Sequence, residues 1–173
     1  QADKYSVPRI AFINKMDKIG ADFYMSLTSI QERLSPNAFA IQLPIGAESS
    51  FSGLIDLIEK KAYKFEGDHG INVVEQPIPA DMNSRVDEFR HKLVEKVAEA
   101  NDEVMSKFLN GQELTVDEIK KGIRTLVLRD NIYPVLCGSA LGNIGVQLVL
   151  DGVVAYLPSP LDVPAIFGTD PKD

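Results

Sequence analysis

The sequence predicts an α/β fold in which part of a doubly wound parallel sheet carries an inserted α+β subdomain. Two apolar runs, residues 9–13 and 133–137, are rich in β-branched and aromatic residues, as buried parallel strands are. Each run ends in a loop of polar or small residues, where open α/β sheets bind their ligands. A strand–helix–strand step needs only about 30 residues, so the far longer segment between the two runs predicts an insertion.

The composition indicates a globular protein without a nucleic-acid-binding surface. The 173 residues are 45% hydrophobic and 25% charged, and the net charge is −7. A negative surface repels phosphate, so direct DNA binding is not expected, and any function near RNA would use protein contacts or parts outside this sequence. No apolar run approaches about 20 residues and the amino end has no signal-peptide pattern, so we expect no membrane association.

Cysteine and histidine usage argues against a disulfide and against a metal site. Cys137 is the single cysteine and cannot form an internal disulfide, which favours a reducing compartment such as the cytosol or an organelle matrix. No histidine is placed to activate it, so Cys137 is expected to be a buried strand residue. His69 and His91 lack Cys, Asp or Glu neighbours at metal-ligand spacing, so no metal held by protein ligands is predicted.

The polar tetrapeptide 14–17, Asn-Lys-Met-Asp, follows the first strand directly. Guanine presents two donors on one edge, N1–H and N2–H₂, and the single carboxylate of Asp17 can accept both. Adenine lacks this pair. The stem of Lys15 can lie over the flat purine face, and Asn14 has a donor and an acceptor for bracing the loop or reaching another edge of the base. A charged turn after a strand is also an ordinary feature, so a second element must support this interpretation.

The elements that follow the tetrapeptide are a helix and then a small antiparallel sheet. Asp22 is a suitable N-cap, and the helix has apolar residues at helical spacing before Ser-Pro-Asn ends it. These apolar residues are Phe23, Leu27, Ile30 and Leu34. Residues 39–43, 61–65 and 71–74 read as strands, with a break at Pro44, while 53–58 fits either a strand or a helical turn. His69 is expected in an exposed turn.

Three helices are predicted next, near residues 86–97, 102–109 and 115–126. The spacing from Thr115 to Glu118 fits a capping box at the start of the third. The first helix presents three acidic residues: Glu88, Glu95 and Glu99. They form either an acidic docking face or an ordinary solvated helix surface, and the second is the commoner case.

A second loop, Gly138-Ser139-Ala140, ends the second parallel strand. Its small residues let backbone N–H groups approach a ligand closely. A final helix carries Val146, Leu150, Val153 and Val154 as its apolar face, and a proline-rich tail follows. With only two parallel strands expected, one edge of residues 9–13 should be exposed.

These elements predict a division of the chain into three parts. Residues 1–42 and 129–157 form the part with the ligand-binding loops, and residues 43–128 form the inserted α+β subdomain. Residues 158–173 are expected to be a linker that leads to a following domain.

Four segments in this order resemble bacterial-type translation elongation factor G: IAFINKMDKIGADF at 10–23, IQLPIGAE at 41–48, CGSA at 137–140 and YLPSPLDVPAI at 156–166. The resemblance implies a partial P-loop GTPase domain whose insert is the subdomain called G-prime. It assigns Asn14, Lys15 and Asp17 to guanine recognition, and Ser139 and Ala140 to the loop that completes the base pocket. One difference is the turn 142–145, Gly-Asn-Ile-Gly, which lacks two positive charges usual in the family.

The resemblance also implies what the intact protein does and with which partners. It implies binding of GTP or GDP, translocation of tRNA and mRNA on the ribosome, and contact between the insert helices and the large-subunit stalk protein. The sequence has no G-x-x-x-x-G-K-[ST] motif, switch loop or catalytic histidine. We therefore expect no catalytic residue here, Mg²⁺ ligands only in the intact parent, and no GTP hydrolysis by this chain alone. A ribosome-recycling paralogue and a non-catalytic stalk-binding module are the alternatives.

Overall fold

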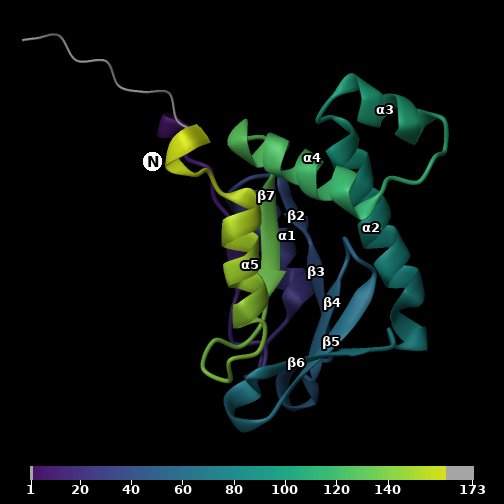
Figure 1. The fold of residues 1–173 in the computed structure, drawn as a ribbon. Helices are drawn as coiled ribbons and strands as arrows, with labels where there is room; N and C mark the ends of the chain where they lie inside the picture. The colour runs from purple at the N-terminus through teal and green to yellow at the C-terminus, as the bar shows by residue number, and fades with distance from the viewer. Residues whose placement is uncertain (1, 163–173) are drawn as a thin grey trace, which may run out of the picture.

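The structure, a computed structural model, describes residues 2–162, which fold into two sheets with α-helices around them (Figure 1). The fold is mixed α/β with a parallel sheet, as predicted. The tail residues 163–173, which belong to the predicted linker, lie outside the described residues. Within the described part, no helix is long and apolar enough to cross a membrane.

The parallel sheet has three strands rather than the two expected. Strand β7 (Tyr133–Cys137) lies between β1 (Ala11–Ile13) and β2 (Ala38–Ala40) and is buried along its whole length. The third strand was missed because the alternating run 39–43 divides at Ile41. Its first part pairs with β7, and its last part turns into the other sheet. β1 has no second neighbour in the described residues, so its outer edge is open, as predicted.

The second sheet is antiparallel and has the order β3-β4-β5-β6. Its strands are β3 (Gln42–Ile45), β4 (Gly53–Asp56), β5 (Lys61–Glu66) and β6 (Asn72–Gln76). The ambiguous run 53–58 is therefore a strand followed by a turn. The break expected at Pro44 is wrong, because β3 is an edge strand and an edge tolerates a residue without a backbone N–H.

The helices agree closely with the predicted positions. They are α1 (Phe23–Arg33), α2 (Asn83–Ala98), α3 (Asp102–Leu109), α4 (Val116–Leu128) and α5 (Val146–Tyr156). Asp22 caps α1 by accepting a hydrogen bond from the Met25 N–H at 2.9 Å, and the Thr115–Glu118 capping box begins α4. Leu34, expected on the apolar face of α1, is 73% exposed because the helix has already ended there.

The apolar face predicted for α5 is wrong. Leu150, Val153 and Val154 are exposed, and the last of them is 82% exposed. The face that packs on β7 instead contains Gly152 and Tyr156, one helical turn apart. A Cβ at Gly152 would lie 3.6 Å from Leu136 Cδ2, so this face meets the strand through its smallest residue.

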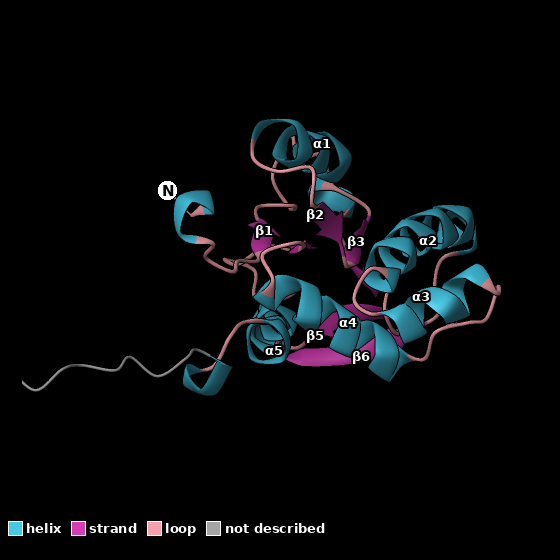
Figure 2. Cartoon of the chain, turned by 90° about the horizontal axis from the view of Figure 1, so that it is seen from above, coloured by secondary structure: helices cyan, strands magenta, loops and turns pink. Residues whose placement is uncertain are grey.

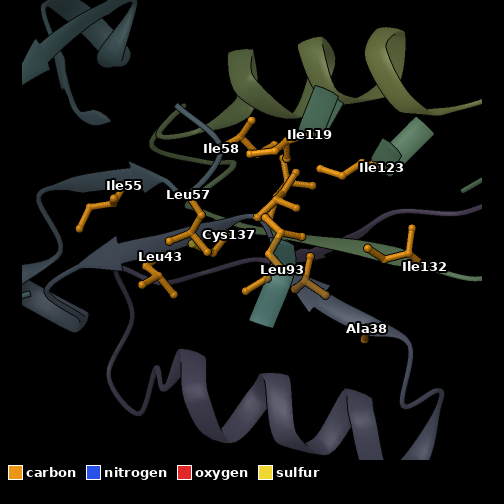
Figure 3. Packing of buried hydrophobic residues seen from close by; sticks show 14 of the residues in the cluster. Ala38, Leu43, Ile55, Leu57, Ile58, Leu93, Ile119, Ile123, Ile132 and Cys137 are labelled. Carbon is orange, nitrogen blue, oxygen red and sulfur yellow. The ribbon is translucent and has the colours of Figure 1, made fainter. Parts of the chain in front are cut away.

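The helices cover both faces of the parallel sheet. Figure 2 shows α1 on one face and α5 on the other, with α4 beside α5. The apolar side chains form a single cluster that includes both sheets and the insert helices. Figure 3 shows part of it, including Leu43, Ile55, Leu57, Leu93, Ile119, Ile123 and Cys137. His69 lies in an exposed turn, as predicted.

Candidate functional site

The pairing of β1 with β7 brings the two predicted loops together. Ile13 is the register partner of Cys137, so both loops leave the sheet at the same level. The Gly138 N–H donates to the Ile13 carbonyl at 3.0 Å, and the Met16 N–H donates to the Gly138 carbonyl at 3.0 Å. Two segments that are distant in the sequence thus form one surface at the carboxyl ends of the strands.

Asn14 connects the two loops through its side-chain carbonyl. Its Oδ1 accepts hydrogen bonds from the Lys15 N–H at 2.8 Å and from the Ala140 N–H at 2.9 Å. This is the bracing role that the sequence allowed. The Ser139 N–H donates to the Ile144 carbonyl, so the N–H groups of residues 138–140 are all engaged within the protein. If a backbone N–H of this loop contacts a base, that N–H must share its present hydrogen bond or release it.

Lys15 lies at the tip of the first loop with a left-handed backbone, φ 64°. Residues other than glycine rarely adopt this conformation, because it costs about 1–3 kcal/mol of backbone strain. Such strained residues cluster at ligand-binding and active sites. Its side chain is exposed and forms no ion pair in the described part of the chain. An exposed alkyl stem with a free ammonium is what stacking on a purine requires.

Asp17 provides an ionised acceptor at the junction of the two loops. Its Oδ2 lies 2.7 Å from the Lys18 ammonium. That ammonium, and after it the Ser139 hydroxyl, hold the pKa of the Asp17 carboxyl below its ordinary value of 3.8. The other oxygen, Oδ1, is buried and accepts no hydrogen bond of normal geometry from residues 2–162. Buried polar atoms are nearly always paired, so an unpaired Oδ1 requires a donor, which a ligand could supply.

Two residues that sequence reasoning did not assign hold the first loop in place. Met16 is buried, and its carbonyl accepts a hydrogen bond from the Glu48 N–H at 2.8 Å. The Glu48 carboxylate in turn accepts from the Gly20 N–H at 2.7 Å. In the sequence, the glycine at position 46 marks the tight turn that presents Glu48. A Cβ at Gly46 would lie 2.1 Å from the Ser50 carbonyl oxygen, so only glycine fits there.

The second loop is closed on itself. Ser139 and Ile144 exchange two backbone hydrogen bonds at 2.9 Å, and the Ser139 side chain is buried inside the turn. Gly138 has to be glycine, because a Cβ would lie 2.2 Å from the Ile144 carbonyl oxygen. The Ser139 hydroxyl therefore faces the protein and Asp17 rather than open solvent.

The remaining predicted residues lie away from this site. Glu88 and Glu95 are exposed on α2, and Glu99 is exposed at its C-cap. Glu88 pairs with Lys92 and Glu99 with Lys96, each at 2.6 Å. Cys137 is buried, and burial raises the pKa of its thiol, so it lacks the properties of a nucleophile. No group of three metal-ligating side chains occurs among residues 2–162.

Comparisons with known proteins agree with this geometry. The family described as "Elongation factor Tu GTP binding domain" matches residues 1–159. A crystal structure of a protein from Thermus thermophilus has a TM-score of 0.81 and 30% sequence identity to this chain. The similarity covers 93% of this chain and 24% of that protein's chain. Because the family match includes both loops and most of the sequence, the chain belongs to the elongation factor Tu-type GTP-binding domain family of translational GTPases.

Proposed function

We propose that this chain supplies the guanine-recognition loops of a translational GTPase of the elongation factor G type. The observation that carries the proposal is the unpaired, buried Oδ1 of the ionised Asp17, held where two loops meet. Guanine N1–H and N2–H₂ would donate to this carboxylate, Lys15 would cover the base, and Asn14 would hold Ser139 and Ala140 beside it. The ligands are GTP and GDP.

The remaining chemistry would belong to the intact protein. This chain spans about a quarter of the length of its Thermus neighbour. The sequence contains no phosphate-cradling motif, so we expect the phosphates and Mg²⁺ to be held by parts outside this sequence. The proposed function of the intact protein is GTP hydrolysis coupled to ribosomal translocation of tRNA and mRNA. A ribosome-recycling paralogue would use the same base pocket.

We also propose that residues 43–128 are the G-prime insert, with residues 1–42 and 129–157 belonging to the nucleotide domain. The sheet topology supports this division, because β3–β6 and α2–α4 lie between β2 and β7 in sequence and β3–β6 form a sheet of their own. The proposed location is the cytoplasm or an organelle matrix.

The base-recognition proposal is tested by changing the acceptor pattern of Asp17. Asp17→Asn replaces one acceptor oxygen by a donor amide, so the pocket should lose guanine and prefer xanthine, whose C2 carbonyl accepts. We expect GDP to shift loop resonances in an NMR titration of the wild type and xanthosine diphosphate to shift them in the variant. ADP should shift neither.

The exposed Asp68, which lies in a turn of the insert, provides the control. Asp68→Asn removes the same charge and should keep the wild-type preference for GDP. Equal responses of the wild type to GDP and ADP would contradict guanine recognition by this site.

A second candidate function is docking to the large-subunit stalk protein through Glu88, Glu95 and Glu99. Glu88 and Glu95, seven residues apart, lie on one exposed face of α2, and Glu99 follows four residues later at the C-cap of the helix. Charge reversal of the three glutamates to lysine should abolish binding of purified stalk protein. Reversal of Glu32, exposed on α1, is the control, and unchanged binding by the triple variant would exclude this face.

A further inference from the structure

A cavity lies between the antiparallel sheet and the helices α4 and α5, apart from the two loops of the proposed guanine site. It has a volume of 240 Å³ and is lined by residues of β3–β5, α4, β7 and α5. None of residues 14–17 or 138–140 lines it. This volume is below the roughly 300–1,000 Å³ typical of pockets for drug-sized ligands, so the cavity suits a smaller molecule.

The cavity has an excess of negative charge. Its lining includes three carboxylates, Asp56, Glu59 and Asp151, and a single cation, Lys120. Lys120 donates to Glu59 Oε1 at 2.6 Å, so this pair neutralises itself. Asp56 and Asp151 form no ion pair within residues 2–162, and Asp151 lies at the exposed side of the cavity.

Asp56 is held rigidly with one oxygen free. Its Oδ1 accepts hydrogen bonds from the Ile58 N–H at 2.7 Å and the Glu59 N–H at 2.8 Å. The described residues offer no hydrogen bond to Oδ2. Burial raises the pKa of this carboxyl. A cation in the cavity would oppose that effect and favour the ionised form.

The unpaired side-chain oxygen of Gln42 indicates a ligand in this cavity. This side chain is only 2% exposed, lines the cavity, and its buried Oε1 has no hydrogen-bond partner in the described part of the chain. A buried amide oxygen without a partner is rare in folded proteins and requires a donor. Gln42 and Asp56 are also register partners on neighbouring strands β3 and β4, so their side chains arise side by side.

Two tyrosines complete the wall. Tyr63 donates to Glu59 Oε2 at 3.3 Å, and burial raises its pKa to about 12, so its hydroxyl stays protonated. Tyr156 is also buried beside the cavity. Aromatic faces attract organic ammonium ions and give no advantage to an anion.

We propose that this cavity binds a small alkylammonium ion. Its N–H groups would donate to Gln42 Oε1 and Asp56 Oδ2, and its alkyl part would lie against the tyrosine rings. Asp151 can receive a second ammonium group at the exposed side, which favours a short diamine. This site is independent of guanine recognition.

The test is an NMR titration of the 173-residue chain with 1,4-diaminobutane, followed at the amides of residues 42, 56–59 and 152. We expect saturable shifts at these amides. The uncharged 1,4-butanediol and potassium chloride at equal ionic strength should give none. Asp56→Asn keeps the Oδ1 acceptor of the turn and removes the charge, so it should weaken binding by about tenfold or more.

Gln42→Leu should also weaken binding, whereas Asp87→Asn on α2, outside the cavity, should leave it unchanged. Absence of shifts, equal shifts with butanediol or potassium chloride, or wild-type affinity in both cavity variants would overturn the proposal. GDP binding, measured in the same samples, reports separately on the guanine loops.

Discussion

The side chain of Asn14 accepts a hydrogen bond from the backbone of Ala140 at 2.9 Å, across 126 positions of sequence. This bond joins the loop after β1 to the loop after β7. The two loops of the proposed guanine site are therefore already joined by protein contacts, and nucleotide affinity should depend on the bonds that hold them together.

The first prediction concerns this connection. Asn14→Ala removes the acceptor of both the Lys15 and the Ala140 N–H groups, so the two loops lose their bridge. We expect GDP affinity to fall by about tenfold or more, as for loss of a positioned hydrogen bond at a ligand site. Hydrogen exchange at the Ala140 amide should become faster.

Asn14→Asp is the matched control, because it keeps the acceptor oxygen. It should preserve the slow exchange at Ala140 while removing the amide donor. If the Ala140 amide exchanges at the same rate in the wild type and in Asn14→Ala, this bond does not hold the loop.

The second prediction concerns the support behind the first loop. Glu48 holds the Gly20 N–H at 2.7 Å, and its own N–H donates to Met16. Glu48→Ala should accelerate exchange at Gly20 and weaken GDP binding several-fold, because residues 16–20 lose a tether. Glu48→Gln keeps a carbonyl acceptor and should behave much like the wild type. Identical exchange at Gly20 in both variants would show that the carboxylate has no positioning role.

The third prediction concerns Gly138. A Cβ at this position would lie 2.2 Å from the Ile144 carbonyl oxygen, so Gly138→Ala forces the backbone of the second loop to move. We expect a loss of about 1–3 kcal/mol in the free energy of unfolding, measured by urea denaturation, together with weaker GDP binding. In Gly152→Ala the new methyl meets nothing closer than 3.6 Å, so stability should be unchanged or higher. Equal stability of the two variants would contradict this reasoning.

The fourth prediction concerns pH and the cap of α4. Lys107, followed by the Thr115 backbone and hydroxyl, lowers the pKa of Glu118 from 4.5 to about 2. A carboxyl with a lowered folded-state pKa stabilises the fold at pH values above its unfolded pKa. This contribution should therefore be complete above about pH 4.5 and should disappear as the pH falls toward 2.

Glu118→Gln measures that contribution. The stability difference between wild type and variant, from urea unfolding, should be largest near neutral pH and should shrink below pH 4.5. Glu32→Gln is the control, because Glu32 is exposed on α1 and has no ion pair among the described residues. A difference that stays constant from pH 7 to pH 3 would contradict the assigned interaction.

Local elements were predictable because their signals lie within a few residues. The N-cap Asp22, the capping box of Thr115 and Glu118, and the limits of β7 all agree with the structure. Each depends on side-chain hydrogen bonds to the nearby backbone or on an uninterrupted apolar run. The motif for which we propose guanine recognition is equally local, since Asn14, Lys15 and Asp17 occupy one loop.

The errors occurred where packing decides between equal local patterns. The run 39–43 alternates throughout, and only its contacts with β7 and β4 divide it between two sheets. The helix α5 has apolar residues on more than one side, and it buries the side with Gly152 because that side can approach Leu136 closely. Amphipathic pattern alone cannot rank two apolar faces.

The sequence by itself determined the α/β class, the helices and their caps, and the pair of loops for which we propose guanine recognition. These features follow from backbone preferences and functional groups that are close along the chain. Only the tertiary structure decided that Asn14 meets Ala140, that Glu48 supports Gly20, and that Gln42 and Asp56 share a cavity with Tyr156. Such contacts depend on strand register and on the burial of distant segments, which no short stretch of sequence specifies.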